Sequence, residues 1–445
     1  MSTPAATKML LSEDQADASW IEAVAAAFEN AGSGSLSDFE ITLAGTVAVT
    51  GARGLQTLLL DKNLTPAQVA ATWSFLSGST GFNADEFIRS KSFELASLNG
   101  IPFTVMDQAG RYALDYALDP LSACHVDGET LNLREAYRRM GFKEGERSLE
   151  DFKKDLEAIR KSLNLAQARV APGETIQLVS LGRHDGAMTA GISMGNMDEA
   201  STVGVFVSGM MSNVREMSDA FDAFNAIRRG ATSNTAMVTW IGYHAPNMLE
   251  ETVQNRADAG APRLASFLDG ITAQRAGNPV NRLVGIGHSY GTNVLAEALK
   301  RTDAHVNAYV TLGSAGLKYG TTADQLGVDE IHATHADGDN IAQTLGRYVQ
   351  FRPPGGDGGG WYEPRVDPRD LEGAHEFSSE ETEDGKAVTM HNLVNPIDWS
   401  GSPEAQWLAD NLDGTAAADE VGYLNPDSST VGKLNEIMRG TWAEK

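Results

Sequence analysis

The chain has 445 residues, of which 60 are acidic and 35 basic, so its formal net charge at neutral pH is −25. Nucleic acid and anionic membrane surfaces would repel such a charge, which argues against both as partners. With 42% hydrophobic residues and this length, the chain is expected to be globular and to form two domains rather than one.

The cysteine count, the N-terminal residues and the apolar runs indicate the cellular compartment to expect. Cys124 is the only cysteine, so no intrachain disulfide can form and nothing demands an oxidising compartment. Residues 1–14 lack the apolar core of a signal peptide. The best apolar run, residues 46–60, is interrupted by Gly51, Arg53 and Gly54 and is no membrane span. We therefore expect a soluble cytoplasmic protein, with secretion without a cleaved signal left open.

Residues 1–165 are expected to form a mostly helical region. Segments 19–30, 65–76 and 148–165 carry apolar residues on one face at helical spacing. Pro66 after Thr65 is typical of a first helical turn, and Ser148 with the acidic residue three places later resembles a capping box. No convincing catalytic set occurs in this region. We therefore expect this region either to cover a site or to provide an interaction surface.

From residue 173 onward, short apolar strands alternate with helices, which is the pattern of a parallel α/β sheet. Strands are expected at 176–181 and 187–194, as an antiparallel pair, and at 202–207, 236–241, 308–312 and 330–334. Helices are expected at 213–229, 262–276 and 404–411, with a surface loop at 353–360. The α/β domain would then span residues 166–430, and residues 431–445 would be a C-terminal tail.

The clearest functional signal lies in residues 280–300. A short apolar run bounded by glycines predicts a buried strand, and the apolar residues that follow recur at helical spacing. Between the two lies Gly-His-Ser-Tyr-Gly at residues 287–291, in the strand, turn and helix order of a nucleophile elbow. Ser289 would sit on the tight turn at the carboxyl edge of the sheet. Side chains at positions 287 and 291 would collide with the neighbouring strand and helix.

A serine hydroxyl becomes a nucleophile when a base removes its proton and a third group orients that base. After such an elbow, the partners follow in the chain order serine, acid, histidine. Asp339 follows the strand expected at 330–334, and His391 lies farther along, before the expected late helix. We expect Ser289 to attack, His391 to take and return the proton, and Asp339 to fix the imidazole tautomer.

Two alternatives to these partners remain open. Asp337 lies on the same loop as Asp339, and only position on the loop favours Asp339. His375 competes with His391 as the base. However, residues 374–379 have the pattern of a strand, and strand interiors rarely supply a catalytic loop.

The oxyanion hole is expected to use two backbone N–H groups, those of Tyr290 and Met210. Met210 follows Gly209 in the loop after the strand at 202–207. The helix behind Ser289 adds free N–H groups and its positive dipole end. Met211 and His288 are the expected substrate-binding side chains, with simple packing as the alternative for both.

Residues 332–339 are dense in histidine and aspartate, the residue types that ligate metal ions. On a strand, His332 and His335 would face opposite sides and could not converge on one ion. The stretch also lacks the helical H-E-x-x-H spacing of a zinc site. We expect no metal and no cofactor.

Several short segments between residues 189 and 413 carry a family resemblance. They are 191–196, 203–209, 238–243, 260–262, 267–268, the elbow at 287–291, and 312–314; residues 98–102 add a looser match in the helical region. In these segments the chain resembles the actinobacterial α/β-hydrolase family catalogued as a domain of unknown function (DUF1023, Abhydrolase_8). The resemblance implies an α/β-hydrolase fold, a mostly parallel sheet flanked by helices, with a helical N-terminal domain. It implies Ser289 as nucleophile, Asp339 as acid and His391 as base.

The chain also departs from the family pattern. The loop after the strand at 202–207 usually reads Pro-Gly-Thr in the family, whereas here it reads Ser-Gly-Met at 208–210, which removes a hydroxyl near the oxyanion site. The histidine lies in Met-His-Asn at 390–392 rather than in Gly-His-Ser. The family's own substrates are poorly defined, so the resemblance implies a reaction class.

The sequence thus predicts a serine hydrolase that cleaves a carboxylic ester, a lipid ester or thioester included, through an acyl-enzyme. Its expected partner is a small-molecule ester substrate. The alternative is a catalytically silent α/β-hydrolase-fold protein that binds a protein partner through its helical N-terminal half. An intact set of serine, aspartate and histidine candidates favours the enzyme, although a fold alone never proves activity.

Overall fold

A computed structural model of the chain describes residues 37–119, 125–126, 129–232, 234–246, 254–339, 342, 365–382, 385–394 and 421–442. The segments expected at 19–30, 353–360 and 404–411 lie outside these residues. The helix expected at 65–76 is confirmed as α3 (Pro66–Ser77), with Thr65 and Gln68 forming a capping box. The helix expected at 148–165 is confirmed as α8 (Leu149–Arg169), which begins after the Ser148 cap.

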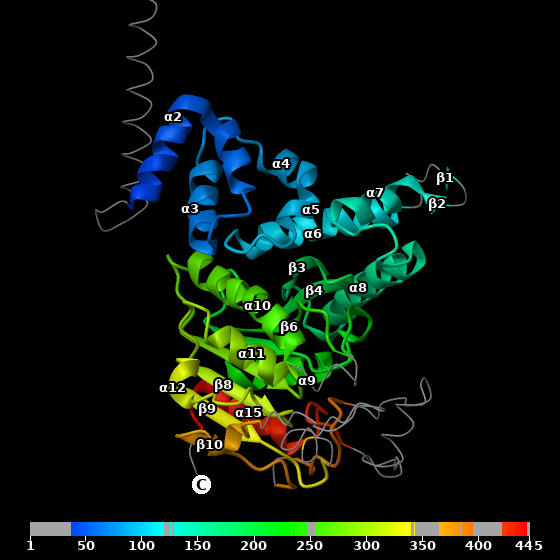
Figure 1. Cartoon of the computed structure of the whole chain (residues 1–445), viewed down its shortest axis with the longest axis vertical. Helices are drawn as coiled ribbons and strands as arrows, with labels where there is room; N and C mark the ends of the chain where they lie inside the picture. The colour runs from blue at the N-terminus through cyan, green and yellow to red at the C-terminus, as the bar shows by residue number, and fades with distance from the viewer. Residues whose placement is uncertain are drawn as a thin grey trace, which may run out of the picture.

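A mixed sheet of eight strands forms the centre of the described chain (Figure 1). In chain order its strands are β3 (Ile176–His184), β4 (Ala187–Met194), β5 (Thr202–Val207), β6 (Thr235–Ile241), β7 (Arg282–His288), β8 (Ala308–Leu312), β9 (Glu330–Thr334) and β10 (Ala374–Glu376). The spatial order is β10-β9-β8-β7-β5-β6-β4-β3. Strand β4 is antiparallel to β3 and β6, and every other neighbouring pair is parallel. The strands expected from the sequence are confirmed, including the antiparallel pair.

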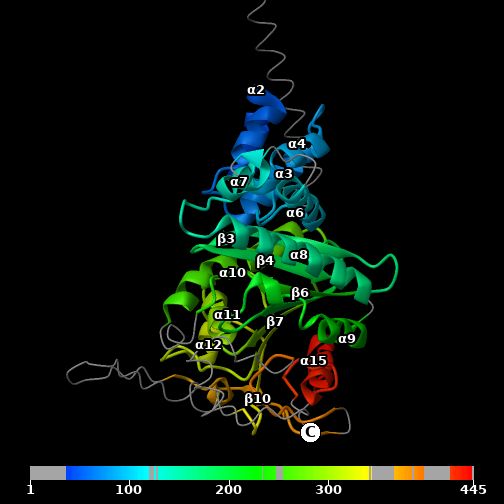
Figure 2. The ribbon, with the colours of Figure 1, turned by 90° about the vertical axis from the view of Figure 1, so that its right-hand side faces the viewer.

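Helices cover both faces of the sheet, which is why its central strands read as continuous apolar runs. Figure 2 shows α10 (Asn255–Gln274) and α11 (Gly291–Leu299) on one side of the sheet. The other side carries α8, α9 (Phe221–Ala231) and α15 (Ser429–Arg439). Each residue of β5, β6 and β8 is buried. The protein therefore has the α/β-hydrolase fold class expected from the sequence.

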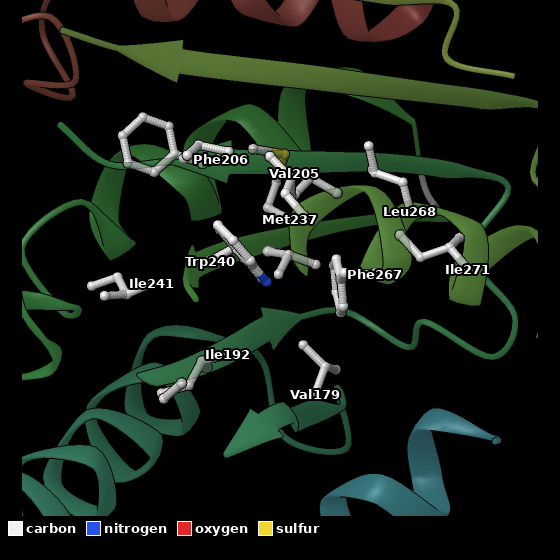
Figure 3. Close-up of a cluster of buried hydrophobic side chains, with 14 of the residues drawn as sticks. Val179, Ile192, Val205, Phe206, Met237, Trp240, Ile241, Phe267, Leu268 and Ile271 are labelled. Atoms are coloured by element: carbon white, nitrogen blue, oxygen red, sulfur yellow. The ribbon is translucent and has the colours of Figure 1, made fainter. Parts of the chain in front are cut away.

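Part of the core lies between the sheet and α10, and Figure 3 shows this part together with buried side chains of the opposite face. Trp240 of β6 and Phe267 of α10 are each 2% exposed, and Leu268 is fully buried. Burying a side chain of this kind stabilises a fold by roughly 1.5–3 kcal/mol. The strands that carry the site are thus held on a rigid support.

The helices of the N-terminal region lie beyond the β3 edge of the sheet, the edge opposite β10, with α6 packed on β3 and α3 packed on α10 (Figure 1). They are α2 (Asp38–Leu59), α3, α4 (Ala84–Ser90), α5 (Ser92–Leu95), α6 (Phe103–Leu118) and α7 (Leu131–Arg139), with a short hairpin of β1 (His125–Val126) and β2 (Glu129–Thr130). On α6, the Asp107 carboxylate accepts the N–H of Leu178 at 2.7 Å, and Arg111 donates to the carbonyl of Ile176 at 3.1 Å. The polar groups of an edge strand are thereby satisfied.

Two expected helices have different boundaries in the structure. Instead of one helix at 213–229, a short 3-10 turn, η1 (Val214–Glu216), precedes α9, because the Asn213 side chain caps the N–H of Arg215 at 2.9 Å. The helix expected from 262 begins at residue 255, so Pro262 lies inside α10. Packing of Gly260 against the Tyr243 ring holds this earlier turn in place.

The expectation of a C-terminal tail at 431–445 is wrong for its first part, because α15 covers Ser429–Arg439. Val431, Leu434, Ile437 and Met438 are buried at helical spacing and pack against the sheet and α9. Met438 also lies beside Gly204 of β5. None of the described helices combines the length and apolar character that a bilayer crossing requires.

Candidate active site

The elbow at Ser289 joins β7 to α11, as the sequence pattern predicts. Ser289 has a positive φ of 54°, a conformation that costs a side-chain-bearing residue energy and that clusters at functional sites. Its N–H donates to the Leu312 carbonyl of β8 at 3.0 Å, which holds the turn against the sheet. A Cβ at Gly291 would lie 2.2 Å from the Val207 carbonyl, and one at Gly287 would lie 2.7 Å from Cα of Thr292. The steric reason expected for both glycines is confirmed.

The topology places the elbow where ligands bind in open α/β sheets. The chain runs from β5 to β6 on one side and then crosses back to β7 on the other side of β5. The crevice at such a switch point, outside the carboxyl ends of the strands, is the usual binding position. The loops after β5 and β7 meet there, because a Cβ at Gly209 would lie 2.7 Å from Cβ of Ser289.

Ser289, His391 and Asp339 form a continuous hydrogen-bonded chain. The Ser289 hydroxyl donates to Nε2 of His391 at 2.8 Å. The other ring nitrogen, Nδ1, lies 2.9 Å from each carboxylate oxygen of Asp339. An ionised carboxylate only accepts hydrogen bonds, so Nδ1 carries the proton and Nε2 is the acceptor that faces the serine. This is the tautomer that a general base for Ser289 requires.

Asp339 is fully buried and yet strongly favoured as a carboxylate. Burial by itself raises the pKa of Asp339, but electrostatic attraction to the His391 imidazole and the hydrogen bonds to the carboxylate outweigh it and lower the pKa to about 2. Besides His391, the donors are the Ala342 N–H at 2.8 Å and the Tyr423 hydroxyl at 2.8 Å. Asp339 is therefore a carboxylate at neutral pH.

Position in the fold distinguishes Asp339 from its alternative Asp337, and His391 from its alternative His375. Asp337 is exposed, and its backbone N–H donates to the carboxylate of Glu380 at 3.1 Å, whereas Asp339 reaches the imidazole. His375 lies on β10, and its ring packs against His332 and Trp442. His391 and Asp339 are thus the pair that the fold brings to Ser289.

His288 directly precedes Ser289, and its ring contacts the loop that carries His391. Its Nε2–H donates to the backbone carbonyl of His391 at 2.8 Å, and its ring packs on His391 and Tyr423. Burial, with the charge of His391, lowers the pKa of His288 to about 3, so it stays neutral. These contacts are those of the packing role that the sequence offered as the alternative for His288.

The residues expected around the oxyanion lie at the same crevice. Tyr290 directly follows Ser289 at the start of α11, and Met210 follows the Gly209 that contacts the serine. Met211 has a positive φ of 59°, donates its N–H to the Pro246 carbonyl at 2.9 Å and keeps its side chain 46% exposed. Because the Met211 N–H is already used, Met210 is the better placed donor on this loop.

Tyr423 is the site residue that sequence reasoning missed. Its hydroxyl accepts the Ala336 N–H at 3.0 Å and donates to Asp339, and the whole side chain is buried. Gly313, with a φ of 51°, gives this ring room, because a Cβ there would lie 2.7 Å from both Tyr423 and Asp339. No spacing in the sequence links residue 423 to the aspartate loop.

The dense histidine stretch makes no ion site in the structure. The His332 ring contacts the Glu330 carboxylate at 2.9 Å, while Nε2 of His335 lies 3.3 Å from the Asp339 carbonyl on the other side. Within the part of the chain that the structure describes, no group of three or more His, Cys, Asp or Glu side chains could hold a metal ion.

A family model described as an alpha/beta hydrolase, Abhydrolase_8, matches residues 184–348. The match includes Ser289 and Asp339 and ends before His391. The resemblance identified from the sequence is therefore confirmed, and the family supports a hydrolase.

Related sequences occur in mycobacteria. An uncharacterized protein of Mycobacterium tuberculosis, Rv0963c, is 29% identical over 215 residues, which are 44% of this chain and 77% of that protein. A second uncharacterized protein of the same organism, Rv2079, is 31% identical over 150 residues, 32% of this chain but only 23% of that protein.

Among solved structures, the chain is similar to a carboxylesterase from Mesorhizobium loti, with 16% identity, a TM-score of 0.30, and coverage of 49% of this chain and 94% of that one. It is also similar to a thermostable esterase from Pseudomonas putida, with 14% identity, a TM-score of 0.28, and coverage of 47% and 77%. At these TM-scores the assignment of the fold rests on the sheet topology and the family match.

Proposed function

Because the chain carries an α/β-hydrolase domain that matches the Abhydrolase_8 family, we propose that it is a serine hydrolase that cleaves a carboxylic ester through an acyl-enzyme. Ser289 is the nucleophile, His391 the general base and acid, and Asp339 the group that holds the imidazole. The observation that carries this proposal is the chain of hydrogen bonds from the Ser289 hydroxyl through His391 to Asp339, at 2.8 and 2.9 Å. Each group lies within the reach that proton transfer needs.

In the first half of the reaction, the Ser289 oxygen attacks the ester carbonyl while Nε2 of His391 takes its proton. The negative charge on the carbonyl oxygen is stabilised by the backbone N–H groups of Tyr290 and Met210 and by the N-terminal end of α11. His391 then gives the proton to the departing alcohol or thiol. Asp339, charged and buried, stabilises the imidazolium formed between these steps.

In the second half, water takes the place of the alcohol. His391 removes a proton from the water, which attacks the acyl-enzyme, and Ser289 leaves with the proton returned to its oxygen. Acid and hydroxyl are the products. A lipid ester or a thioester fits the same sequence of steps, because the leaving atom needs only a proton from His391.

The test is covalent labelling with a fluorophosphonate probe, which reacts with activated serines. Wild type is compared with Ser289→Ala, and the labelled peptide is located by mass spectrometry. We expect labelling at Ser289, and loss of labelling and of ester turnover in a variant that unfolds at the wild-type temperature. A folded wild-type protein that takes no label would contradict the proposal and favour the catalytically silent interaction protein.

A further inference from the structure

A cavity of about 320 Å³ lies beside the loop that follows β5. Its volume is at the lower end of the range for ligand pockets. Its walls come from that loop, from the loop after β6, from the start of β4 and from the beginning of α8. They include Met188, Met211, Asn213, Tyr243, Arg147 and Asp155. The cavity is therefore closed on one side by the N-terminal helical region.

The cavity is close to Ser289. Gly209 touches the serine, and Met211, two residues on, lines the cavity. Two Cα steps span at most about 7–8 Å. Tyr243 contacts both places, because it lines the cavity and its hydroxyl donates to the Ser208 carbonyl at 2.8 Å. The cavity therefore lies next to the residues that hold the turn of Ser289.

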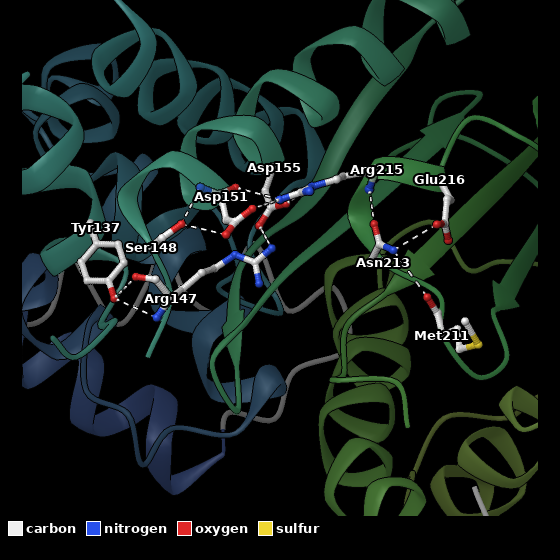
Figure 4. Close-up of polar contacts among 9 residues, drawn as sticks. All are labelled: Tyr137, Arg147, Ser148, Asp151, Asp155, Met211, Asn213, Arg215 and Glu216. Carbon is white, nitrogen blue, oxygen red and sulfur yellow. Dashed lines mark hydrogen bonds and ion pairs between the residues drawn. The ribbon is translucent and has the colours of Figure 1, made fainter. Parts of the chain in front are cut away.

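The backbone of Arg147 is held in place before any ligand arrives (Figure 4). The Tyr137 hydroxyl donates to the Arg147 carbonyl at 2.9 Å and accepts its N–H at 3.3 Å. The Tyr137 ring in turn packs on Phe142 and Phe152. Arg147 therefore presents its side chain from a fixed turn at the start of α8.

Arg147 shares its acidic partner with a second arginine. Its Nη2 pairs with Asp155 at 2.5 Å, but the same carboxylate also accepts from Nε of Arg215 at 2.6 Å. Asp151 pairs with Arg215 on its exposed side at 3.1 Å. Nε of Arg147 is buried and has no hydrogen-bond partner among the described residues. The Arg147 side chain as a whole is nevertheless 25% exposed and lines the cavity, so an acceptor bound there would contact it.

We propose that this cavity binds the far end of the ester substrate and that Arg147 receives a carboxylate carried there. The inference rests on the proposed function and specifies the class of substrate. That substrate is an ester whose acyl half or alcohol half ends in an acidic group. The apolar walls, Met188, Met211 and Tyr243, contact the chain between the two ends. Flexible methionines admit chains of differing shape. The space is roughly ten water volumes, enough for a short diacid chain.

The test compares acidic and neutral esters of equal length. For the acyl half, the pair is the p-nitrophenyl monoester of glutaric or adipic acid against p-nitrophenyl pentanoate or hexanoate. For the alcohol half, the pair is butyrate esterified to 4-hydroxybutyrate against butyl butyrate. The measured quantity is the ratio of kcat/KM for the acidic ester to that for the neutral ester.

We expect wild type to favour the acidic ester in one of the two series and Arg147→Gln to lower that ratio about ten- to a hundredfold, as for loss of a charged hydrogen bond. Arg147→Lys keeps the charge and should recover part of the ratio. Arg183→Gln is the matched control: Arg183 is also 25% exposed and paired with an acid, Glu146, and its Nε is also buried without a partner, but it does not line the cavity. Its ratio should equal that of wild type.

A wild type without preference for the acidic ester in either series would overturn the proposal, and so would an unchanged ratio in Arg147→Gln. Both esters are measured on the same preparation. A loss of folded protein lowers the two apparent kcat/KM values equally and leaves their ratio unchanged, whereas a change in substrate preference alters the ratio. Fluorophosphonate labelling of the same samples separates the two proposals. Labelled Ser289 without acid preference removes only the cavity proposal, whereas unlabelled folded protein removes the proposed function itself.

Discussion

The hydroxyl of Tyr423 donates to Oδ2 of Asp339 at 2.8 Å, with both side chains fully buried. The same carboxylate lies 2.9 Å from Nδ1 of His391, so one aspartate is held between a tyrosine and the imidazole. The tyrosine comes from a segment next to α15, far along the chain from the aspartate loop. This contact gives the acid of the site a fixed orientation.

Removal of the Tyr423 hydroxyl should lower kcat more than it changes KM. In Tyr423→Phe, Asp339 loses one donor and is freer to rotate, so the imidazole is less well oriented toward Ser289. We expect kcat to fall about tenfold, the effect of losing one hydrogen bond to a charged group. Steady-state kinetics on an ester substrate measure the two constants. An equal fall after Tyr112→Phe, which removes an exposed hydroxyl bound to Asp85, would contradict a local effect.

Acid should destabilise the protein partly through Asp339. The pKa of this carboxyl is lowered in the folded state from 3.8 to about 2, so its contribution to stability is complete above about pH 4 and disappears as the pH falls through 2. The contribution is on the order of 2 kcal/mol. Urea unfolding of wild type between pH 2 and 5 should show this loss, and Asp339→Asn should lack it.

Asp337→Asn is the control for that experiment, because Asp337 lies on the same loop but is exposed. Its unfolding free energy should follow the wild-type pH dependence. The same variants separate the two candidate acids in activity. Asp339→Asn should lose several orders of magnitude in kcat because an amide can hold the wrong imidazole tautomer. A larger loss in Asp337→Asn would reverse the assignment.

A methyl group at Gly209 should disable the site without unfolding the protein. Its Cβ would lie 2.7 Å from Cβ of Ser289 and 3.0 Å from the His288 carbonyl, so the loop after β5 would have to move. A displacement of about 1 Å at reacting groups typically costs about a hundredfold in rate. We expect Gly209→Ala to lower fluorophosphonate labelling by about that factor. Gly277→Ala, where a Cβ meets nothing within 4 Å, should label like wild type.

Much of the fold was predictable because its signals are local. The strands at 202–207, 308–312 and 330–334 have the predicted ends, since each is a continuous apolar run between turn residues. The elbow was equally plain, because strand, glycine, serine, glycine and helix follow one another directly in the chain. The helix at 429–439 was missed although its apolar spacing is regular, because its role depends on packing against α9 and β5.

By itself, then, the sequence determined the α/β fold class, the elbow at Ser289, and His391 with an aspartate of the 337–339 loop as its candidate partners. The tertiary structure decided which aspartate reaches the imidazole, placed the His288 ring against the loop of His391, and brought Tyr423 and Arg147 to places that no spacing indicates. The reason is physical. Strand, turn and helix follow from interactions between residues close in the chain, whereas the contact of His391 with Asp339 spans 52 residues and that of Tyr423 spans 84. Contacts over such distances exist only once the strands between them have been ordered in the sheet.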